Sequence, residues 1–252
     1  MCDCWLTRRG MLRLAGAGGA VLLTGCDEIS EIDLVSEGQV EEMGLRAWQE
    51  IKSQTPVARN SEEQRLLNRV SSLLLKAAGE KPEQWEVLVF DRPEVNAFAL
   101  PGRKIGVFQG MFRVGQNEDQ LAAVVGHEIG HVQAEHGQER INAQVAKDWG
   151  LRLIAFLLQM GDVEFAAEIA AALGLGVEYG LVLPYSRSQE LEADRFGIRL
   201  MAEAGYRPPE AIAFWQRMQA AGGAQQPEFL STHPAPQSRI EELREMLGQL
   251  KG

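Results

Sequence analysis

Cysteine is scarce in this sequence: there are three in 252 residues, and all of them lie before residue 27. The chain is therefore not a disulfide scaffold, and a secreted domain of this kind depends on its core or on a metal for stability. Basic residues are also in the minority, with 25 Lys and Arg against 35 Asp and Glu, which gives a net charge of −10. This balance argues against nucleic-acid binding through a face that neutralises phosphates.

Long hydrophobic runs are missing as well. Segments 151–160 and 163–183 are strongly apolar, but their longest stretch without a charged or strongly polar residue is Ile169–Val177. That stretch is shorter than the roughly 20 residues that a membrane span needs. We interpret the two segments as a helical hairpin that covers the core or lies against a membrane. The composition, 45% hydrophobic and 24% charged, is typical of a globular protein.

Residues 1–25 have the features of an export signal that is removed from the mature protein. Three arginines at positions 8, 9 and 13 precede the apolar stretch Leu14–Leu23. The next residues, Thr24-Gly25-Cys26, complete a resemblance to a bacterial lipobox, and the arginine pair resembles a twin-arginine signal. A short membrane anchor is the alternative, although the apolar stretch falls short of a span.

The N-terminus therefore predicts a lipoprotein of the bacterial cell envelope, on the periplasmic side, anchored by a lipid on Cys26 in the inner or outer membrane. Residues 26–38 would form an acidic tether and residues 39–252 the folded domain. Removing residues 1–25 takes away three arginines and one aspartate, so 22 basic and 34 acidic residues remain, a charge of −12. The lipid, not the charge, would hold this chain at the membrane.

Hydrophobic periodicity predicts helices at about 39–53 and 61–78, followed by strands at 85–90, 96–100 and 104–108. Pro101-Gly102 is the expected turn between the last two strands. Asn117, with Gln120 three residues later, has the pattern of a helix N-cap, and this helix is expected to run to about His136 and to stop at Gly137. Later helices are expected over 186–200 and from Pro208 onward, before a loop at 222–227.

The decisive motif is His127-Glu128-Ile129-Gly130-His131, which matches H-E-x-x-H. Residues four apart share one face of a helix, so both imidazoles can bind the same zinc ion. Glu128 lies close enough to take a proton from water at that ion. Two ordinary core histidines are the alternative, but the chain has only four histidines, which makes a chance match rare.

A catalytic zinc site needs a third protein ligand, and the sequence offers three candidates. His136 lies half a turn from the ligand face of a continuous helix, so we interpret it as a helix-end residue that meets the C-terminal dipole. His233 lies in a His-Pro turn. Glu190 and Asp194 share one face of a predicted helix, so Glu190 can bind zinc while Asp194 accepts the distal N–H of a ligand histidine. Glu192 is expected in solvent, and an exposed acidic face is the alternative for the whole segment.

Four stretches together resemble a known family: H-E-I-G-H at 127–131, E-x-E-A-D at 190–194, N-A-F-A-L-P-G at 96–102 and H-P at 233–234. They resemble the zinc metallopeptidase family of the CAAX prenyl endopeptidase and the HtpX heat-shock protease, in particular its periplasmic BepA-like and LoiP-like lipoproteins. The resemblance covers roughly residues 64–247. It implies an α+β fold, a mostly helical zincin-like domain with a small β-sheet whose edge strand borders the active site.

By that resemblance His127, His131 and Glu190 hold one Zn²⁺ per chain, Glu128 is the general base and Asp194 supports a ligand. Substrate would bind by β-augmentation to the edge strand formed by Asn96, Ala97, Phe98 and Ala99. His233 resembles the family's oxyanion-stabilising histidine and Arg239 its accompanying substrate-binding arginine. A buried hairpin, a His-Pro turn and a surface arginine are the alternatives for these three elements. The family usually has Gly-Gly where this chain has Gly102-Arg103, so the peptide preference stays open.

The sequence thus predicts a gluzincin-type zinc endopeptidase that degrades misfolded or unassembled envelope polypeptides. The alternative is a chaperone or assembly factor for envelope proteins that uses the same edge strand and cuts rarely. A purely structural zinc site is disfavoured, because Glu128 stands where only catalysis needs an acid. A resting state in which His233 takes the open ligand position is a further hypothesis, which four protein ligands at one site would support.

Overall fold

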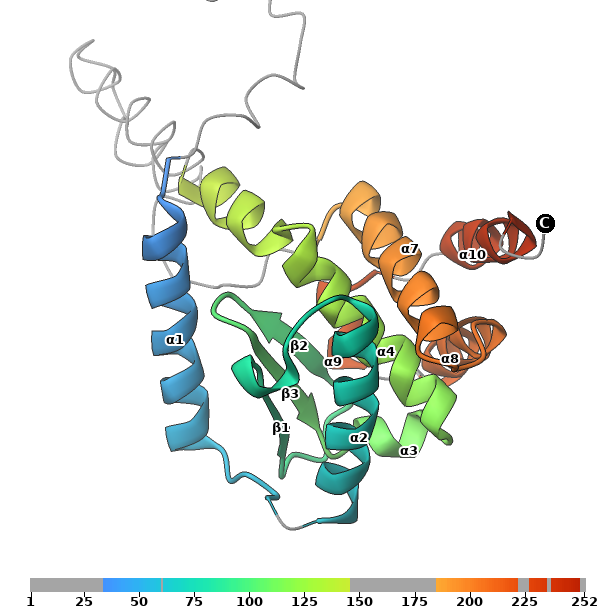
Figure 1. The fold of residues 1–252 in the computed structure, drawn as a ribbon, viewed down its shortest axis with the longest axis horizontal. Helices are drawn as coiled ribbons and strands as arrows, with labels where there is room; N and C mark the ends of the chain where they lie inside the picture. Colours follow the sequence, from blue (N-terminus) through green and yellow to red (C-terminus); the bar gives the residue numbers. More distant parts are fainter. Residues whose placement is uncertain (1–33, 60, 146–184, 222–226, 235–236, 250–252) are drawn as a thin grey trace, which may run out of the picture. The chain divides into compact units, whose positions relative to one another are not determined.

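Three short strands form a mixed sheet in the order β1-β3-β2 (Figure 1). In the computed structural model the described residues are 34–59, 61–145, 185–221, 227–234 and 237–249. Strand β1 (Glu86–Phe90) pairs in parallel with β3 (Lys104–Phe108), and β2 (Ala97–Leu100) pairs with β3 in the antiparallel sense. The turn between β2 and β3 contains two left-handed residues, Gly102 at φ 84° and Arg103 at φ 60°. Within the described sheet β2 is therefore an edge strand.

Helices cover both faces of the sheet (Figure 1). Side chains alternate along a strand, so one face presents Phe90 and Phe108, which pack with Trp48 of α1 (Glu37–Gln54). The opposite face belongs to the main core, which is built with α2 (Glu62–Ala77) and α4 (Glu118–Gln133). A 3-10 turn, Pro82–Gln84, leads from α2 into β1.

Five further helices of the described residues complete the core around α4, apart from the helical segment that begins at His136. They are α3 (Met111–Val114), α7 (Arg187–Glu203), α8 (Pro209–Ala221), α9 (Glu228–Thr232) and α10 (Gln237–Gln249). Helix α7 packs most closely on α4, and small residues allow that approach. A Cβ at Gly130 would lie 2.8 Å from the Ala193 carbonyl oxygen, and a Cβ at Gly197 would lie 2.9 Å from the backbone nitrogen of His127. This close packing sets the distance between the two helices that carry the candidate site.

The fold is α+β and mostly helical, as the sequence predicted, and the predicted strands and helices agree with the structure to within a few residues. The end of the 118–136 helix was predicted incorrectly. Helix α4 ends at Gln133, Glu135 takes a left-handed φ of 55°, and helical structure resumes at His136 and continues through Gly137. His136 is therefore not the end of α4, and Gly137 does not stop a helix. Helix α1 begins at Glu37, inside the segment that we expected to be tether.

The predicted signal (1–25), the lipidation site Cys26 and the apolar segments 151–160 and 163–183 lie outside the described residues. No helix within the described ranges combines the length and the apolar character that crossing a membrane requires.

Candidate metal centre

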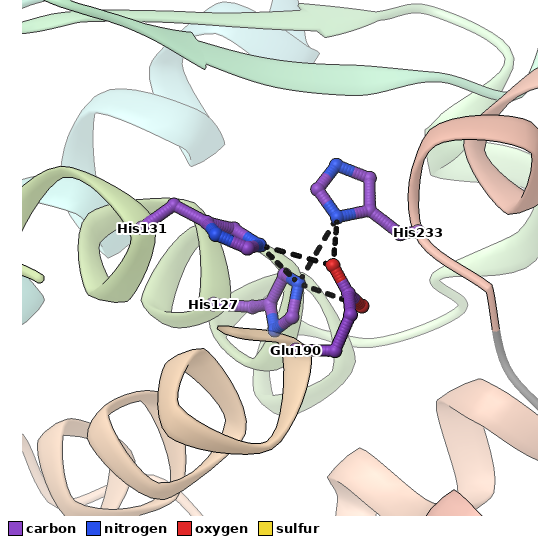
Figure 2. Close-up of side chains that lie close together, drawn as sticks. All are labelled: His127, His131, Glu190 and His233. Carbon is purple, nitrogen blue, oxygen red and sulfur yellow. Dashed lines mark hydrogen bonds and ion pairs between the residues drawn. The ribbon is translucent and has the colours of Figure 1, made fainter. Parts of the chain in front are cut away.

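Helix α4 carries both histidines of the H-E-x-x-H motif. Its first turn is capped by Asn117, whose side-chain oxygen accepts a hydrogen bond from the Gln120 backbone N–H. His127 and His131 are each 2% exposed. Because an α-helix has 3.6 residues per turn, the two rings leave α4 on one side, and their Nε2 atoms lie 3.0 Å apart (Figure 2).

Helix α7 brings Glu190 against this pair. Its Oε1 lies 3.3 Å from Nε2 of His131, and its Oε2 lies 3.6 Å from Nε2 of His127. The N-terminus of α7 is closed by a capping box between Ser186 and Gln189, so Glu190 lies in the first turn of a well-formed helix.

His233, directly after α9, is the fourth side chain of the group. Its Nδ1 lies 2.9 Å from Oε1 of Glu190 and 3.3 Å from Nε2 of His127 (Figure 2). Tyr185 contacts the segment that carries His233: its backbone N–H donates to the carbonyl oxygen of Thr232, the last residue of α9, at 3.1 Å. The Tyr185 ring also stacks on His131, with ring centroids 3.8 Å apart. The structure thus brings His127, His131, Glu190 and His233 together, with one donor atom of each within 4.8 Å of the others.

The buried imidazole nitrogens and the Glu190 carboxylate point at one another, and such a group of hydrogen-bond acceptors is stable only with a positive charge between them. Burial opposes a charge on His127, but Glu190 and Asp194 outweigh burial and raise the pKa of His127 to about 9. Burial, together with the neighbouring charge of His127, lowers the pKa of His131 well below its usual value. A proton on His127 thus balances the site when no cation is bound, and a divalent cation would replace that proton. The donor set of imidazole nitrogens and a carboxylate oxygen fits a divalent metal.

Asp194 and Arg239 contact the candidate ligand side chains on the side away from the centre of the group. Asp194 Oδ1 lies 3.0 Å from Nδ1 of His127, which fixes Nε2 as the atom that faces the centre. Arg239 donates to Asp194 from Nε at 2.6 Å and from Nη2 at 2.8 Å, and its Nη1 donates to Glu190. Its guanidinium carbon also lies 3.9 Å from the centroid of the Trp215 ring.

The positive charges of Arg239 and His127 stabilise the negative charges of Asp194 and Glu190. Burial alone would raise the pKa of Asp194, but Arg239 and His127 lower it to about 2. In the same way, His127 and Arg239 outweigh burial and hold the pKa of Glu190 below its usual range. The sequence predicted that Arg239 binds substrate. The structure places this side chain, 2% exposed, next to the carboxylates of Glu190 and Asp194, to which it donates hydrogen bonds.

Glu128 is fully buried beside the convergent group. Neither of its carboxylate oxygens accepts a hydrogen bond from a described residue, and Oε1 lies 3.5 Å from Nε2 of His233. A buried carboxylate without hydrogen-bond donors is costly. The Glu128 carboxylate therefore keeps acceptor capacity that no described donor uses.

The free edge of β2 is formed by the backbone of Ala97 and Ala99. The Phe108 N–H donates to the Asn96 carbonyl oxygen at 2.9 Å, and hydrogen-bonded pairs alternate along an antiparallel ladder. The intervening residues Ala97 and Ala99 therefore direct their N–H and C=O groups away from β3. The Phe98 ring packs against Phe108, with centroids 5.9 Å apart, and so contributes to the core on the α1 side.

A cavity of about 860 Å³ lies at the end of this strand, and His131 is the member of the convergent group that lines it. Its lining includes Ala99 and Leu100 of β2, His131, Tyr185 and the turn residue Arg103. Beside β2, Asn96 is 8% exposed, and its Oδ1 has no hydrogen-bond partner among the described residues.

His136 was predicted to lie away from the ligand face, but the structure brings it next to the site. His136 is 1% exposed, and its Nδ1 lies 2.9 Å from Nδ1 of His131. A straight helix would have directed this ring elsewhere, and only the break after Gln133 brings it back. Burial lowers the pKa of His136.

Comparison with known proteins gives a consistent result. A model of Peptidase family M48 matches residues 60–247. The mitochondrial metalloendopeptidase OMA1 of Schizosaccharomyces pombe is 36% identical over 183 residues, which cover 72% of this chain and 52% of that protein. The beta-barrel assembly-enhancing protease of Escherichia coli is 29% identical over 224 residues, or 86% of this chain and 45% of that protein. The chain therefore spans about half the length of these relatives.

Proposed function

The chain belongs to peptidase family M48, and on that premise we propose that it is a zinc-dependent endopeptidase of the bacterial cell envelope. Its substrates are misfolded or unassembled envelope polypeptides, and its metal ligands are His127, His131 and Glu190. The observation that carries the proposal is the convergence of buried imidazole and carboxylate groups on one point, beside the buried carboxylate of Glu128, which accepts no hydrogen bond from a described residue.

The separations of the donor atoms support zinc in particular. A tetrahedral zinc site has bonds of about 2.0–2.1 Å, which sets its ligand atoms roughly 3.3 Å apart. The contacts among the four side chains run from 2.9 Å, for His233 and Glu190, to 3.6 Å, for His127 and Glu190, and one donor atom of each lies within 4.8 Å of the others. Harder cations such as Mg²⁺ and Ca²⁺ favour oxygen ligands, whereas three of the four donors here are nitrogens.

The surrounding residues account for peptide hydrolysis. Zinc held by His127, His131 and Glu190 would supply Lewis-acid chemistry, since it would lower the pKa of water toward about 7 and polarise a carbonyl group. Glu128 takes the proton of the attacking water and passes it to the leaving nitrogen. Ala97 and Ala99 hold the substrate backbone as an added strand along β2. His233, once it has moved away from Glu190, donates a hydrogen bond to the oxyanion of the tetrahedral intermediate.

The envelope location is supported by the lipobox-like sequence that ends at Cys26 and by the name of the Escherichia coli relative, a beta-barrel assembly-enhancing protease. The OMA1 relative is named as mitochondrial, so it supports the protease activity and not the location. Lipid attached to Cys26 would keep the domain at a membrane surface, where unassembled envelope proteins are exposed.

Metal removal tests the proposed activity directly. We expect the full chain to cleave an unfolded outer-membrane protein and to leave the same protein intact once it is folded, because β-augmentation requires an extended backbone. A chelator should abolish the cleavage, and added zinc should restore it. The measurement is product formation on a denaturing gel with zinc content determined in parallel. Cleavage that persists in a zinc-free sample would contradict the proposal.

An assembly factor that cuts rarely is the second candidate, and the position of His233 favours it. With Nδ1 of His233 2.9 Å from Glu190 and 3.3 Å from Nε2 of His127, the site has four protein donors, and no position is left for water. A resting state of this kind would bind unfolded chains along β2 and hydrolyse them slowly. Binding of unfolded protein with no cleavage under any condition would favour this candidate.

His233→Ala tests whether this histidine closes the site. A hydroxamate inhibitor binds zinc at the position that water would take, so its affinity falls when another group occupies that position. We expect the variant to bind a peptide hydroxamate at least about tenfold more tightly than the unaltered chain does, because the competing side chain is gone. Calorimetry on the zinc-loaded proteins measures this, with the exposed neighbour change Ser231→Ala as control. Equal affinities in all three proteins would contradict a closed resting state.

A further inference from the structure

A chain of polar contacts runs from the candidate ligand His131 to the protein surface. Nδ1 of His131, the nitrogen that does not face the centre, lies 2.9 Å from Nδ1 of His136. Nε2 of His136 lies 3.3 Å from Oε2 of Glu192. The His136 side chain is 1% exposed, whereas that of Glu192 is 55% exposed. Thus a buried histidine connects the candidate ligand to a carboxylate in solvent.

The backbone departs from ideal helix geometry at the place that makes this contact possible. On a continuous helix His136, five residues after His131, would lie about 140° away around the axis. Instead α4 ends at Gln133, and Glu135 adopts a left-handed φ of 55°. That conformation is sterically unfavourable for a residue other than glycine. The Glu135 carbonyl oxygen then accepts the backbone N–H groups of Gln138 and Glu139, which start the next helical segment.

A consistent set of protonation states can be assigned to His131, His136 and Glu192, in which each contact has one donor and one acceptor. A histidine that binds a metal through Nε2 is neutral and carries its proton on Nδ1. The Nδ1–H of His131 therefore donates to Nδ1 of His136, which must be an acceptor. His136 then carries its own proton on Nε2 and donates it to the carboxylate of Glu192. Each of the three groups has the tautomer or charge that its neighbour requires.

We propose that His136 and Glu192 are positioning residues that orient His131 for metal binding, and this inference rests on the proposed zinc site. The two ligand histidines would then be supported differently. His127 donates to the buried Asp194, which Arg239 holds. His131 donates to a neutral imidazole, and the charge that completes its support stays in solvent on Glu192. Outer hydrogen-bond partners of this kind fix the orientation of a ligand ring and raise its basicity.

The order of zinc affinities in two His136 variants tests the proposal. His136→Phe keeps a ring in the buried space but removes the acceptor, so we expect zinc to bind about 10- to 100-fold more weakly. His136→Asn places Oδ1 near the position of Nδ1 and should recover most of that loss. A residue that only fills space would give the opposite order, because phenylalanine replaces a buried ring better than asparagine does. Competition with a chromophoric chelator measures the affinities in the full chain.

A second readout separates ligand orientation from packing. The visible absorption bands of Co²⁺ bound in place of zinc depend on the geometry of the ligands, and we expect them to shift in His136→Phe and to return toward the original spectrum in His136→Asn. The thermal midpoint of the metal-free protein should be similar in the two variants. A zinc affinity for His136→Phe that equals or exceeds that of His136→Asn would overturn the proposal.

Glu192→Ala keeps the proposal testable even if the His136 variants do not fold, because Glu192 is exposed. We expect it to weaken zinc binding in the same direction but by less, while Glu203→Ala, an exposed acid on the same helix, leaves the affinity unchanged. Equal affinities for the two alanine variants would also overturn the proposal. If the unaltered chain binds no zinc, the proposed function fails first. Tight zinc binding that is insensitive to His136 and Glu192 removes only the positioning role.

Discussion

Replacing Glu128 by glutamine is expected to abolish cleavage while the metal stays bound. The amide has the shape of the carboxylate but cannot accept the proton of the attacking water, so the rate should fall by about 10²- to 10⁴-fold. Glu128 is fully buried, and its oxygens have no hydrogen-bond partner among the described residues. The substitution therefore breaks no observed hydrogen bond, and the fold should persist. Cleavage of an unfolded outer-membrane protein and zinc content are measured on the same sample.

Glu245→Gln makes the same chemical change on the exposed side of α10 and is the matched control, with unaltered activity expected. The Glu128→Gln protein should also still bind unfolded substrate along β2, because the edge strand is intact. Full cleavage activity in Glu128→Gln would contradict the role of Glu128 as general base.

His131→Ala is expected to cause a larger loss of zinc affinity than the change of any outer hydrogen-bond partner. It removes one of the converging nitrogens, so zinc affinity should fall well beyond the roughly 10- to 100-fold that loss of an outer hydrogen-bond partner causes. A metal that binds only the folded state stabilises that state. The unaltered chain should therefore melt at a higher temperature with zinc than without it, and this difference should vanish in His131→Ala. Zinc titration with calorimetric melting curves measures both effects.

Val132→Ala is the matched control for this change, since Val132 is the next residue of α4 and contributes no donor atom to the site. It should retain zinc and the stabilisation that zinc provides. Retention of stoichiometric zinc by His131→Ala would show that the metal is held elsewhere.

Local sequence patterns predicted much of the candidate site because helical periodicity acts over four residues. His127 and His131 share a face of α4 for that reason, and Glu190 shares a face of α7 with Asp194. Turn chemistry worked equally well at Gly102, where φ is 84° and glycine has no steric penalty. Each of these features depends on interactions between residues close in the chain.

The parts that could not be predicted depend on tertiary context. Glutamate rarely adopts a left-handed conformation, for which glycine or asparagine is the usual marker. The sequence therefore did not predict the end of α4 at Gln133 and the change of direction that brings His136 to the site. Arginine is rarely buried without partners, and the burial of Arg239 is possible only because Glu190 and Asp194 arrive from another helix. The parallel pairing of β1 with β3, which leaves β2 at the edge, also joins strands that are not consecutive.

The most direct test of the zinc site is a crystal structure of the full chain grown with zinc, with anomalous scattering recorded on both sides of the zinc absorption edge. We expect one strong anomalous peak per chain, about 2.0–2.1 Å from Nε2 of His127, Nε2 of His131 and a carboxylate oxygen of Glu190. A peak bound by other residues, or a Glu190 side chain directed away from the two histidines, would contradict it.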